Sequence, residues 1–293
     1  MLFMDPVFFL WLIPLAIALD MRFGDPQDLP LMHPARRIRR FLELLEPEAR
    51  KLGDTRAVGV LCALTTAGLT GAVVWLLTGV LPGLWAAFSL YFAYSGLGFG
   101  CLLHTGAAAL DLLEHGGLPE AQAIVGQMAN CDATAQDRPA LYASLAESLS
   151  KNMTDAVIGP LFWLMLTGPV GLWIYKAVNT IGSVWTYKTP RWKSLGWAGA
   201  RLDQALAFAP ARLGAFFLYL AARLQGNAAI KHKPLMEPQG AAWDAQRVRC
   251  LMRQTRLAGL LAAGFFYLAA LAFFCGAHFF STASRLAFFA PMR

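Results

Sequence analysis

The sequence has few charged residues. Asp, Glu, Lys and Arg make up 15% of the 293 residues, whereas soluble proteins average about 25%. Hydrophobic residues account for 57%, and the mean hydropathy is +0.48. Residues 57–110 contain no Asp, Glu, Lys or Arg at all. These deficits exclude an ordinary soluble protein and indicate several membrane-spanning segments.

Motifs of several common protein classes are also missing. The five cysteines form no C-x-x-C pair and the five histidines are scattered, which argues against a zinc site or a disulfide framework. No phosphate-binding loop, serine-hydrolase or zinc-protease motif occurs. No zinc-finger or RNA-binding signature accompanies the net charge of +7. We therefore expect no nucleic-acid partner and assign the excess positive charge to loops that contact anionic membrane lipid.

Long apolar runs predict an all-α, multi-pass integral membrane helical bundle. One crossing takes about 20 residues, and the uncharged run divides at the turn signal Leu81-Pro82-Gly83. We also expect amphipathic cytoplasmic helices between Asp111 and Lys151. The predicted spans lie near residues 3–19, 57–81, 84–110 and 257–280, with polar loops at 20–56, 111–160, 175–212 and 223–256.

Two further apolar runs are too short for a simple crossing. Residues 161–174 number 14 and contain Gly168-Pro169, and residues 213–222 form a still shorter run between two arginines. Runs of 10–14 residues are more often re-entrant or interfacial. With four crossings, every basic loop lies on the cytoplasmic side of a bacterial inner membrane, as the positive-inside rule favours. Six simple crossings with a weaker charge bias are the alternative.

Polar side chains gather on both sides of residues 161–174. Such groups near a membrane interior are costly and usually functional. Carboxylates suit Mg²⁺, while Lys and Arg suit phosphate. The combination indicates phosphate-dependent chemistry at a membrane surface, and solvation of helix ends is the alternative. These residues are Glu147, Asn152, Asp155, Lys176, Asn179, Lys188, Arg201, Asp203 and Arg212.

Four sequence blocks occur in order over roughly residues 15–220. The first is L-D-M-R-F-G-D-P from Leu19, followed by His33-Pro34, and the second is E-S-L-S-K-N-M-T-D-A-V-I-G-P-L-F-W from Glu147. The third is Y-K-A-V-N-T-I-G-S-V-W-T-Y-K from Tyr175, and the fourth is A-R-L-D-Q-A-L-A-F-A-P-A-R from Ala200. Together they resemble the CbiB/CobD family, the adenosylcobinamide-phosphate synthases of cobalamin biosynthesis.

The resemblance implies an enzyme that uses ATP and Mg²⁺ to attach aminopropanol, or its phosphate, to the carboxylate of adenosylcobyric acid. It also implies a corrinoid substrate and other membrane enzymes of the pathway as partners. The matching residues are assigned as catalytic (Glu147, Asn152, Asp155, Asn179, Asp203), as substrate- or phosphate-binding (Asp25, His33, Lys176, Ser183, Tyr187, Lys188, Arg201, Arg212) and as metal ligands (Glu147, Asp155, Asp203). Lys151, which departs from the family pattern, is also assigned to substrate or phosphate binding. We expect the first set and Arg201 to converge on one cytoplasm-facing cavity, with Lys188 and Arg212 at its rim.

The blocks depart from the family pattern at several polar positions. Lys151 replaces a glutamate, Gly182 and Gln204 replace aspartates, and Ala207 replaces an asparagine. Residues 130–133 replace a G-R-D-T element. These changes predict weaker Mg²⁺ binding, with Lys151 neutralising phosphate instead. The alternative to an active ligase is a non-catalytic membrane paralogue, an AmpE-like regulatory or corrinoid-binding protein. A transporter would be expected to show inverted repeats, and none is visible.

Overall fold

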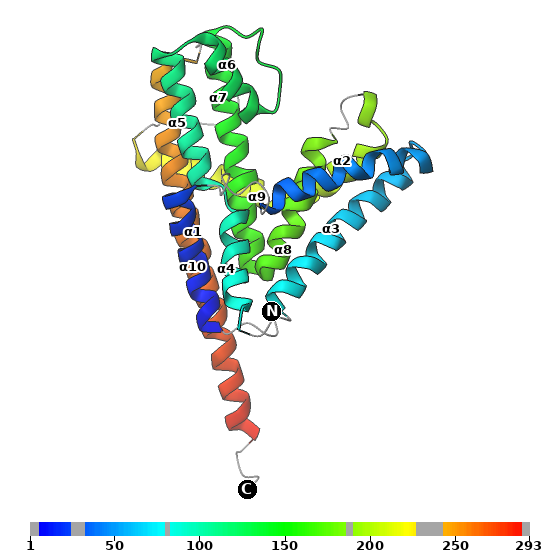
Figure 1. Ribbon diagram of the computed structural model, residues 1–293. Coiled ribbons are helices and arrows are strands. Elements are labelled where there is room, and N and C mark those ends of the chain that lie inside the picture. Colours follow the sequence, from blue (N-terminus) through cyan, green and yellow to red (C-terminus); the bar gives the residue numbers. More distant parts are fainter. Residues whose placement is uncertain (1–5, 25–32, 80–82, 186–189, 227–242, 289–293) are drawn as a thin grey trace.

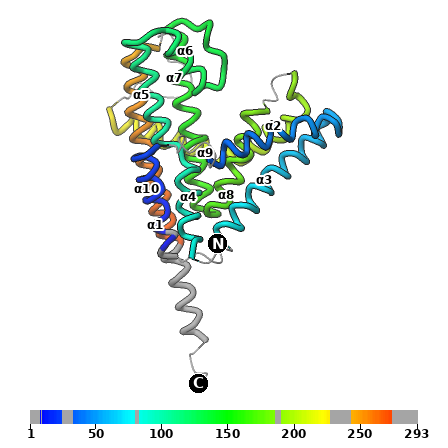
Figure 2. Tube along the Cα trace, in the orientation of Figure 1, coloured from blue at the N-terminus to red at the C-terminus, as the bar shows by residue number. Residues whose placement is uncertain are grey.

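The computed structural model describes residues 6–24, 33–79, 83–185, 190–226 and 243–288, which form helices and no strand (Figures 1 and 2). The all-α class is therefore confirmed. The elements are α1 (Pro6–Phe23), α2 (Pro34–Leu52), α3 (Arg56–Gly79), α4 (Trp85–Gly96), α5 (Phe99–His115), α6 (Leu118–Ala129), α7 (Arg138–Asn152), a π-helical turn η1 (Met153–Ile158), α8 (Gly159–Val184), a 3-10 turn η2 (Pro190–Trp192), α9 (Leu195–Leu224) and α10 (Ala245–Phe288).

Five helical segments of the described residues are long and apolar enough to cross a membrane, by length and composition. The chain is a membrane protein. Three of the segments fall on predicted spans, and α1 covers most of the predicted N-terminal span. The other two segments include the short apolar runs for which no crossing was predicted. The five are Arg56–Gly79, Trp85–His115, Arg138–Val184, Leu195–Leu224 and Ala245–Phe273.

Much of the sequence predicted as polar loop is helical instead. Helix α2 lies inside the predicted loop 20–56, and α6 and α7 lie in the predicted loop 111–160, where helices were expected between Asp111 and Lys151. Helix α7 is not a surface amphipathic helix, because most of its residues from Leu141 to Ser150 are buried or half-buried and it belongs to the apolar segment Arg138–Val184. Residues 213–222 are not a separate short helix but the last part of α9, which begins within the predicted loop 175–212. Amphipathicity explains the difference, because a helix that buries one face keeps a polar average composition. In α2, for example, Ile38, Leu42 and Ala49 are buried while the four arginines 36, 37, 39 and 40 are exposed.

The predicted span 84–110 is broken between α4 and α5. At the break, the Gly98 amide donates to the Ala156 carbonyl of η1 at 3.0 Å. The buried Asp20 of α1 accepts a hydrogen bond through Oδ2 from the Gly100 amide at 2.9 Å. This bond satisfies one of the free amides at the start of α5. A Cβ on Gly100 would collide with the Asp20 carbonyl oxygen, so glycine is needed for this approach.

Helix α8 reverses direction at Gly168-Pro169. Gly168 has φ 72° and ψ −164°, a conformation that favours glycine. Gly159 and Tyr175 are 16 positions apart, which is about 24 Å along a straight helix, yet a Cβ on Gly159 would collide with the Tyr175 hydroxyl. The two limbs of α8 therefore lie side by side, and Figure 1 shows the chain descending from α7 and returning along α8. How this hairpin lies in a membrane stays a prediction.

Candidate functional site

Two aspartates from different helices face each other inside the bundle. Asp155 belongs to η1 and Asp203 to α9, both side chains are half-buried, and their charges interact. Asn179 of α8 donates from Nδ2 to Asp203 Oδ1 at 3.1 Å and also contacts the Asp155 carboxylate. Three of the five residues predicted as catalytic therefore meet at one place, which we call the aspartate cluster (Asp155, Asn179 and Asp203).

Two lysines complete the charge balance of the aspartate cluster. The positive charges of Lys151 and Lys176 both act on Asp155, and that of Lys151 also acts on Asp203. Lys151 is exposed at the end of α7, whereas Lys176 is half-buried on the returning limb of α8. Two carboxylates and two ammonium groups together carry no net charge. This balance suits an ionic group in an apolar bundle, where an unpaired buried charge would be costly.

Local backbone features position these side chains. The π-helical turn η1 re-aims Asp155 between α7 and α8, and such turns often occur at functional sites. Small residues let α8 and α9 approach closely, as is usual between membrane helices. A Cβ on Gly182 would lie 3.3 Å from both Cβ and Oδ2 of Asp203, and one on Gly199 would collide with Ile181. This close approach brings Asn179 within hydrogen-bonding distance of Asp203.

Tyr175 is a site residue that was not predicted from the sequence. Its side chain is buried, and both aspartate charges act on its hydroxyl. Among the described residues the hydroxyl has no hydrogen-bond partner, although buried polar atoms are normally paired. Tyr175 is the first residue of the third block, directly before the predicted site residue Lys176. This position in the block could have indicated Tyr175 as a site residue too.

Two side-chain hydrogen bonds connect α6 to the ends of α7 and α8. Asn130, which ends α6 with φ 52°, donates from Nδ2 to the Ser183 carbonyl at 3.2 Å. Asn152 donates from Nδ2 to the Met128 carbonyl at 3.3 Å, so it anchors α6. Asn130 also lines a pocket of about 500 Å³. The other lining residues are Gln122, Ala123, Gly126, Gln127, Cys131, Asp132, Ala133 and Thr134.

The predicted metal-ligand set is not assembled. Glu147 is exposed on α7, two helical turns before Asp155, and is not among the groups that act on either aspartate. The part of the chain that the structure describes holds no group of three His, Cys, Asp or Glu side chains able to bind a metal. Lys151 and Lys176 already offset the two remaining carboxylates. These residues do not fit a metal ion held by the protein alone.

The remaining predicted residues lie apart from the aspartate cluster or outside the described ranges. Arg201 is exposed and donates to Gln204 Oε1 at 3.3 Å, and Arg212 donates to the Phe208 carbonyl at 2.9 Å. The buried His33 precedes α2, and its carbonyl accepts from the amides of the next helical turn. Asp25, Tyr187 and Lys188 lie outside the described residues.

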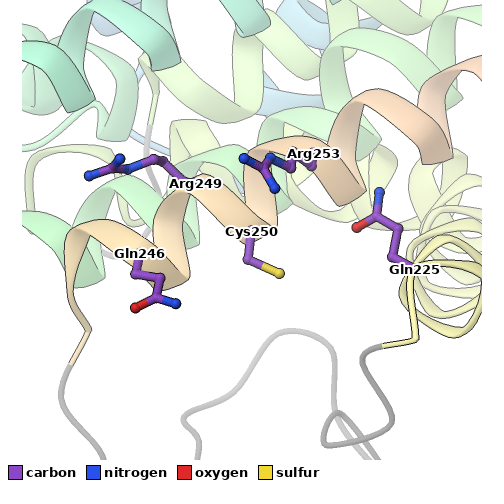
Figure 3. Close-up of a pocket in the computed structure, with 5 residues that line it drawn as sticks. All are labelled: Gln225, Gln246, Arg249, Cys250 and Arg253. Atoms are coloured by element: carbon purple, nitrogen blue, oxygen red, sulfur yellow. The ribbon is translucent and has the colours of Figure 1, made fainter.

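Another pocket, of about 760 Å³, lies between the end of α9 and the first turns of α10 (Figure 3). Gln225, Gln246, Arg249, Cys250 and Arg253 line it. None of them is a predicted site residue, and neither aspartate reaches this pocket. Because the predicted catalytic residues meet at the aspartate cluster and not at this pocket, the aspartate cluster is the candidate site.

Comparison with known proteins supports the resemblance found in the four blocks. Cobalamin biosynthesis protein CobD of Pelobacter propionicus is 34% identical over 226 residues, which are 73% of this chain and 67% of that protein. The CobD protein of Geobacter metallireducens is 35% identical over 223 residues, 72% of this chain and 67% of that protein. The CobD protein of Listeria monocytogenes serovar 1/2a is 32% identical over 210 residues, 69% of this chain and 66% of that protein.

No solved structure matches the chain. A family model described as CobD/Cbib protein matches residues 13–279. That range includes all four blocks and every residue of the aspartate cluster. The chain therefore belongs to the CobD/Cbib family.

Proposed function

We propose that this protein is a membrane-bound ATP-dependent amide ligase of cobalamin biosynthesis. It would join aminopropanol, or its phosphate, to the carboxylate of adenosylcobyric acid. Membership of a family whose relatives are named for cobalamin biosynthesis supports the pathway. The observation that carries the proposed chemistry is the meeting of Asp155, Asn179 and Asp203 with Lys151 and Lys176.

The first step would make the corrinoid carboxylate reactive. A carboxylate oxygen attacks the γ-phosphorus of ATP, the bond to the bridging oxygen breaks, and an acyl phosphate and ADP form. Lys151 and Lys176 would offset negative charge on the transferring phosphoryl group. Mg²⁺ would enter as a component of the MgATP substrate, bound to the nucleotide's phosphates.

The second step would form the amide. The amine nitrogen attacks the acyl carbon, the C–O bond to phosphate breaks, and inorganic phosphate leaves. One of the two aspartates would accept the proton that the amine loses. Asn179 would hold Asp203 in place through the 3.1 Å hydrogen bond, since the geometry of the two reactants decides the rate.

ATP and corrinoid substrates both require access from the cytoplasm. We therefore propose that the aspartate cluster opens to the cytoplasmic side of the bacterial inner membrane. Membrane lipid would surround the apolar helices, and other membrane enzymes of the pathway would be partners. We propose no nucleic-acid partner.

A non-catalytic corrinoid-binding paralogue is the second candidate. The position of Glu147 favours it, because this carboxylate stays exposed and outside the aspartate cluster.

Complementation distinguishes the two candidates. A bacterial strain that lacks its own synthase would receive the wild-type chain, Asp203→Asn, or Lys51→Ala as an exposed control on α2. We expect cobalamin-dependent growth with the wild type and Lys51→Ala and none with Asp203→Asn. Supplied cobinamide should restore growth in every strain. If wild-type protein is present in the membrane but growth fails, the paralogue is favoured.

A further inference from the structure

A groove of about 530 Å³ lies where α1, α5 and α10 pack together, apart from the aspartate cluster. Arg249, Arg253 and Arg256 line its α10 side, at intervals of four and three residues. Such intervals place side chains on one face of a helix. We call this cavity the arginine groove. Its lining also includes Leu103, His104 and Met252.

The arginine groove has an excess of positive charge. Arg249 donates from Nη2 to Glu114 Oε1 at 2.6 Å, so these two charges offset each other. Asp111, the other acid in the lining, pairs with a histidine of its own helix at 3.2 Å. Within the described ranges, Arg253 and Arg256 are exposed and have no carboxylate partner. Two guanidinium groups are therefore available to bind an anion.

Apolar side chains line the same groove beside the arginines. Leu110 is buried, and Leu103 and Met252 are half-buried. Met21, from the last turn of α1, adds a further apolar side chain. A complementary ligand therefore carries a negative charge next to hydrocarbon. A small soluble anion supplies only the charge.

Helices α5 and α10 run antiparallel along the arginine groove, and Figure 1 shows them side by side. Glu114, near the end of α5, pairs with Arg249. At the start of α5, the Phe99 ring lies so close to Gly259 of α10 that a Cβ on this glycine would collide with it. The polar ends of the two helices therefore meet on the same side.

The arginine groove also lies at the polar end of two membrane-length segments. Trp85–His115 and Ala245–Phe273 are both long and apolar enough to cross a membrane. In α10 the three arginines directly precede residues 257–273, which contain no Asp, Glu, Lys or Arg. Arginines at the end of such a segment reach the level of the lipid headgroups. Basic pockets between membrane helices at this level bind anionic headgroups.

We propose that the arginine groove is a specific site for one anionic phospholipid. Arg253 and Arg256 donate to the oxygens of its phosphate, and the hydrocarbon next to the phosphate packs on Leu103 and Met252. Such a site differs from the general attraction between basic segments and anionic lipid. A guanidinium group donates two parallel hydrogen bonds to a phosphate, whereas an ammonium group of equal charge acts as a point charge.

Native mass spectrometry of the purified full-length protein in non-ionic detergent tests the proposal. The protein is titrated with phosphatidylglycerol and, separately, with phosphatidylcholine that has the same acyl chains. We expect one phosphatidylglycerol to bind saturably to the wild type, and phosphatidylcholine to bind at least about tenfold more weakly. The double variant Arg253→Gln/Arg256→Gln should lose at least about tenfold in affinity for phosphatidylglycerol, because it loses the charged donors to the phosphate.

Two further double variants separate a specific site from diffuse attraction. Arg39→Gln/Arg40→Gln removes the same number of exposed charges from α2 and should keep the saturable binding of the wild type. Arg253→Lys/Arg256→Lys keeps the charge of the groove but not the paired donors, so its affinity should fall between those of the wild type and the glutamine variant. Circular dichroism and elution in size-exclusion chromatography check the folding of every variant.

Three outcomes would overturn the proposal. Binding of many phosphatidylglycerol molecules without saturation, with equal losses in the α2 and α10 glutamine variants, would show diffuse attraction only. Equal affinities for phosphatidylglycerol and phosphatidylcholine would show that the charge of the headgroup is not recognised. Wild-type affinity in Arg253→Lys/Arg256→Lys would show that positive charge alone suffices.

Competition distinguishes a lipid phosphate from a soluble one. Inorganic phosphate or ATP is added to the wild type that carries one phosphatidylglycerol. We expect the lipid to stay bound, since neither competitor contacts the apolar part of the groove. Displacement of the lipid by either anion at a lower concentration than phosphatidylglycerol itself requires would assign the groove to a soluble phosphate and overturn the lipid assignment. The titrations need no turnover, so their result is independent of the proposed ligase reaction.

Discussion

Asp20 provides a sharp test of how the site is positioned. Its side chain is fully buried on α1, and its Oδ2 accepts a hydrogen bond from the Gly100 amide at 2.9 Å. The same α4–α5 break bonds to η1 through Gly98 and Ala156 at 3.0 Å, next to Asp155. Asp20→Ala removes the acceptor, whereas Asp20→Asn keeps a carbonyl oxygen at the same place and removes the charge.

The expected changes in the free energy of unfolding follow from the loss of the hydrogen bond and the loss of the charge. A hydrogen bond to a charged group contributes about 1.5–3 kcal/mol, and a negative charge at a helix N-terminus contributes about 0.3–1 kcal/mol. We expect Asp20→Ala to lower the free energy of unfolding by about 2–4 kcal/mol. Asp20→Asn loses only the charge and should cost about 1 kcal/mol.

Unfolding is measured in mixed micelles with increasing denaturing detergent, followed by circular dichroism. Asp111→Ala is the matched control, because this aspartate lies on α5 but is exposed and pairs only with His115 at 3.2 Å among the described residues. Its cost should stay below about 0.5 kcal/mol. Equal losses for Asp20→Ala and Asp20→Asn would refute the hydrogen-bond explanation, and no loss in either would refute the role of Asp20 in joining α1 to α5.

Three further predictions concern helix packing, the site and α2. Gly59→Ala should lower the free energy of unfolding by about 1–3 kcal/mol, because its Cβ would lie 2.5 Å from the Leu195 carbonyl oxygen; Gly68→Ala on the same helix meets nothing within 4 Å and should be neutral or stabilising in the same titration. Asn179→Ala removes the 3.1 Å hydrogen bond to Asp203 and should reduce amide formation about 10- to 100-fold, and unchanged turnover would exclude a positioning role. Burial opposes ionisation of Glu46, but hydrogen bonds from Arg191 and Arg50 outweigh it and hold the pKa of Glu46 below 4.5. Its contribution to stability is therefore present above pH 4.5 and lost as the pH falls through the lowered pKa, so the stability difference between wild type and Glu46→Gln should shrink as the solution is acidified; a stability difference that does not change with pH would contradict this.

The sequence predicted the helices that are apolar on every side. Helix α3 agrees with the predicted span 57–81 within two residues at its ends. The dipeptide Gly168-Pro169 also predicted the reversal within residues 161–174, since it combines a permissive residue with one that has no amide hydrogen. Helix α2 was missed, because its buried face is narrow and its average composition is polar.

The break between α4 and α5 could not be predicted from its own residues. The run from Trp85 to His115 is apolar and contains no proline. The break depends on contacts with Asp20 and Ala156, which are distant in sequence. Tertiary contacts of this kind are invisible to a local pattern.

The candidate site was predicted in part. Asp155, Asn179 and Asp203 meet because the hairpin and α9 bring both ends of residues 161–174 to one place. Glu147 lies in the same sequence block and helical segment as Asp155 but two helical turns before it. Two residues of one block therefore need not lie at the same site. The Tyr175 hydroxyl is held near the site by the close approach of Tyr175 to Gly159 across the hairpin. This approach depends on the fold and cannot be predicted from the local sequence.

A direct assay of amide formation tests whether the protein is an ATP-dependent amide ligase. Purified protein in lipid nanodiscs would be mixed with adenosylcobyric acid, MgATP and either aminopropanol or aminopropanol phosphate, and products would be identified by mass spectrometry. The proposed ligase activity predicts an adenosylcobinamide product and ADP in equal amounts, both abolished by Asp203→Asn. Folded wild-type protein that binds adenosylcobyric acid but forms neither product with either amine would contradict it.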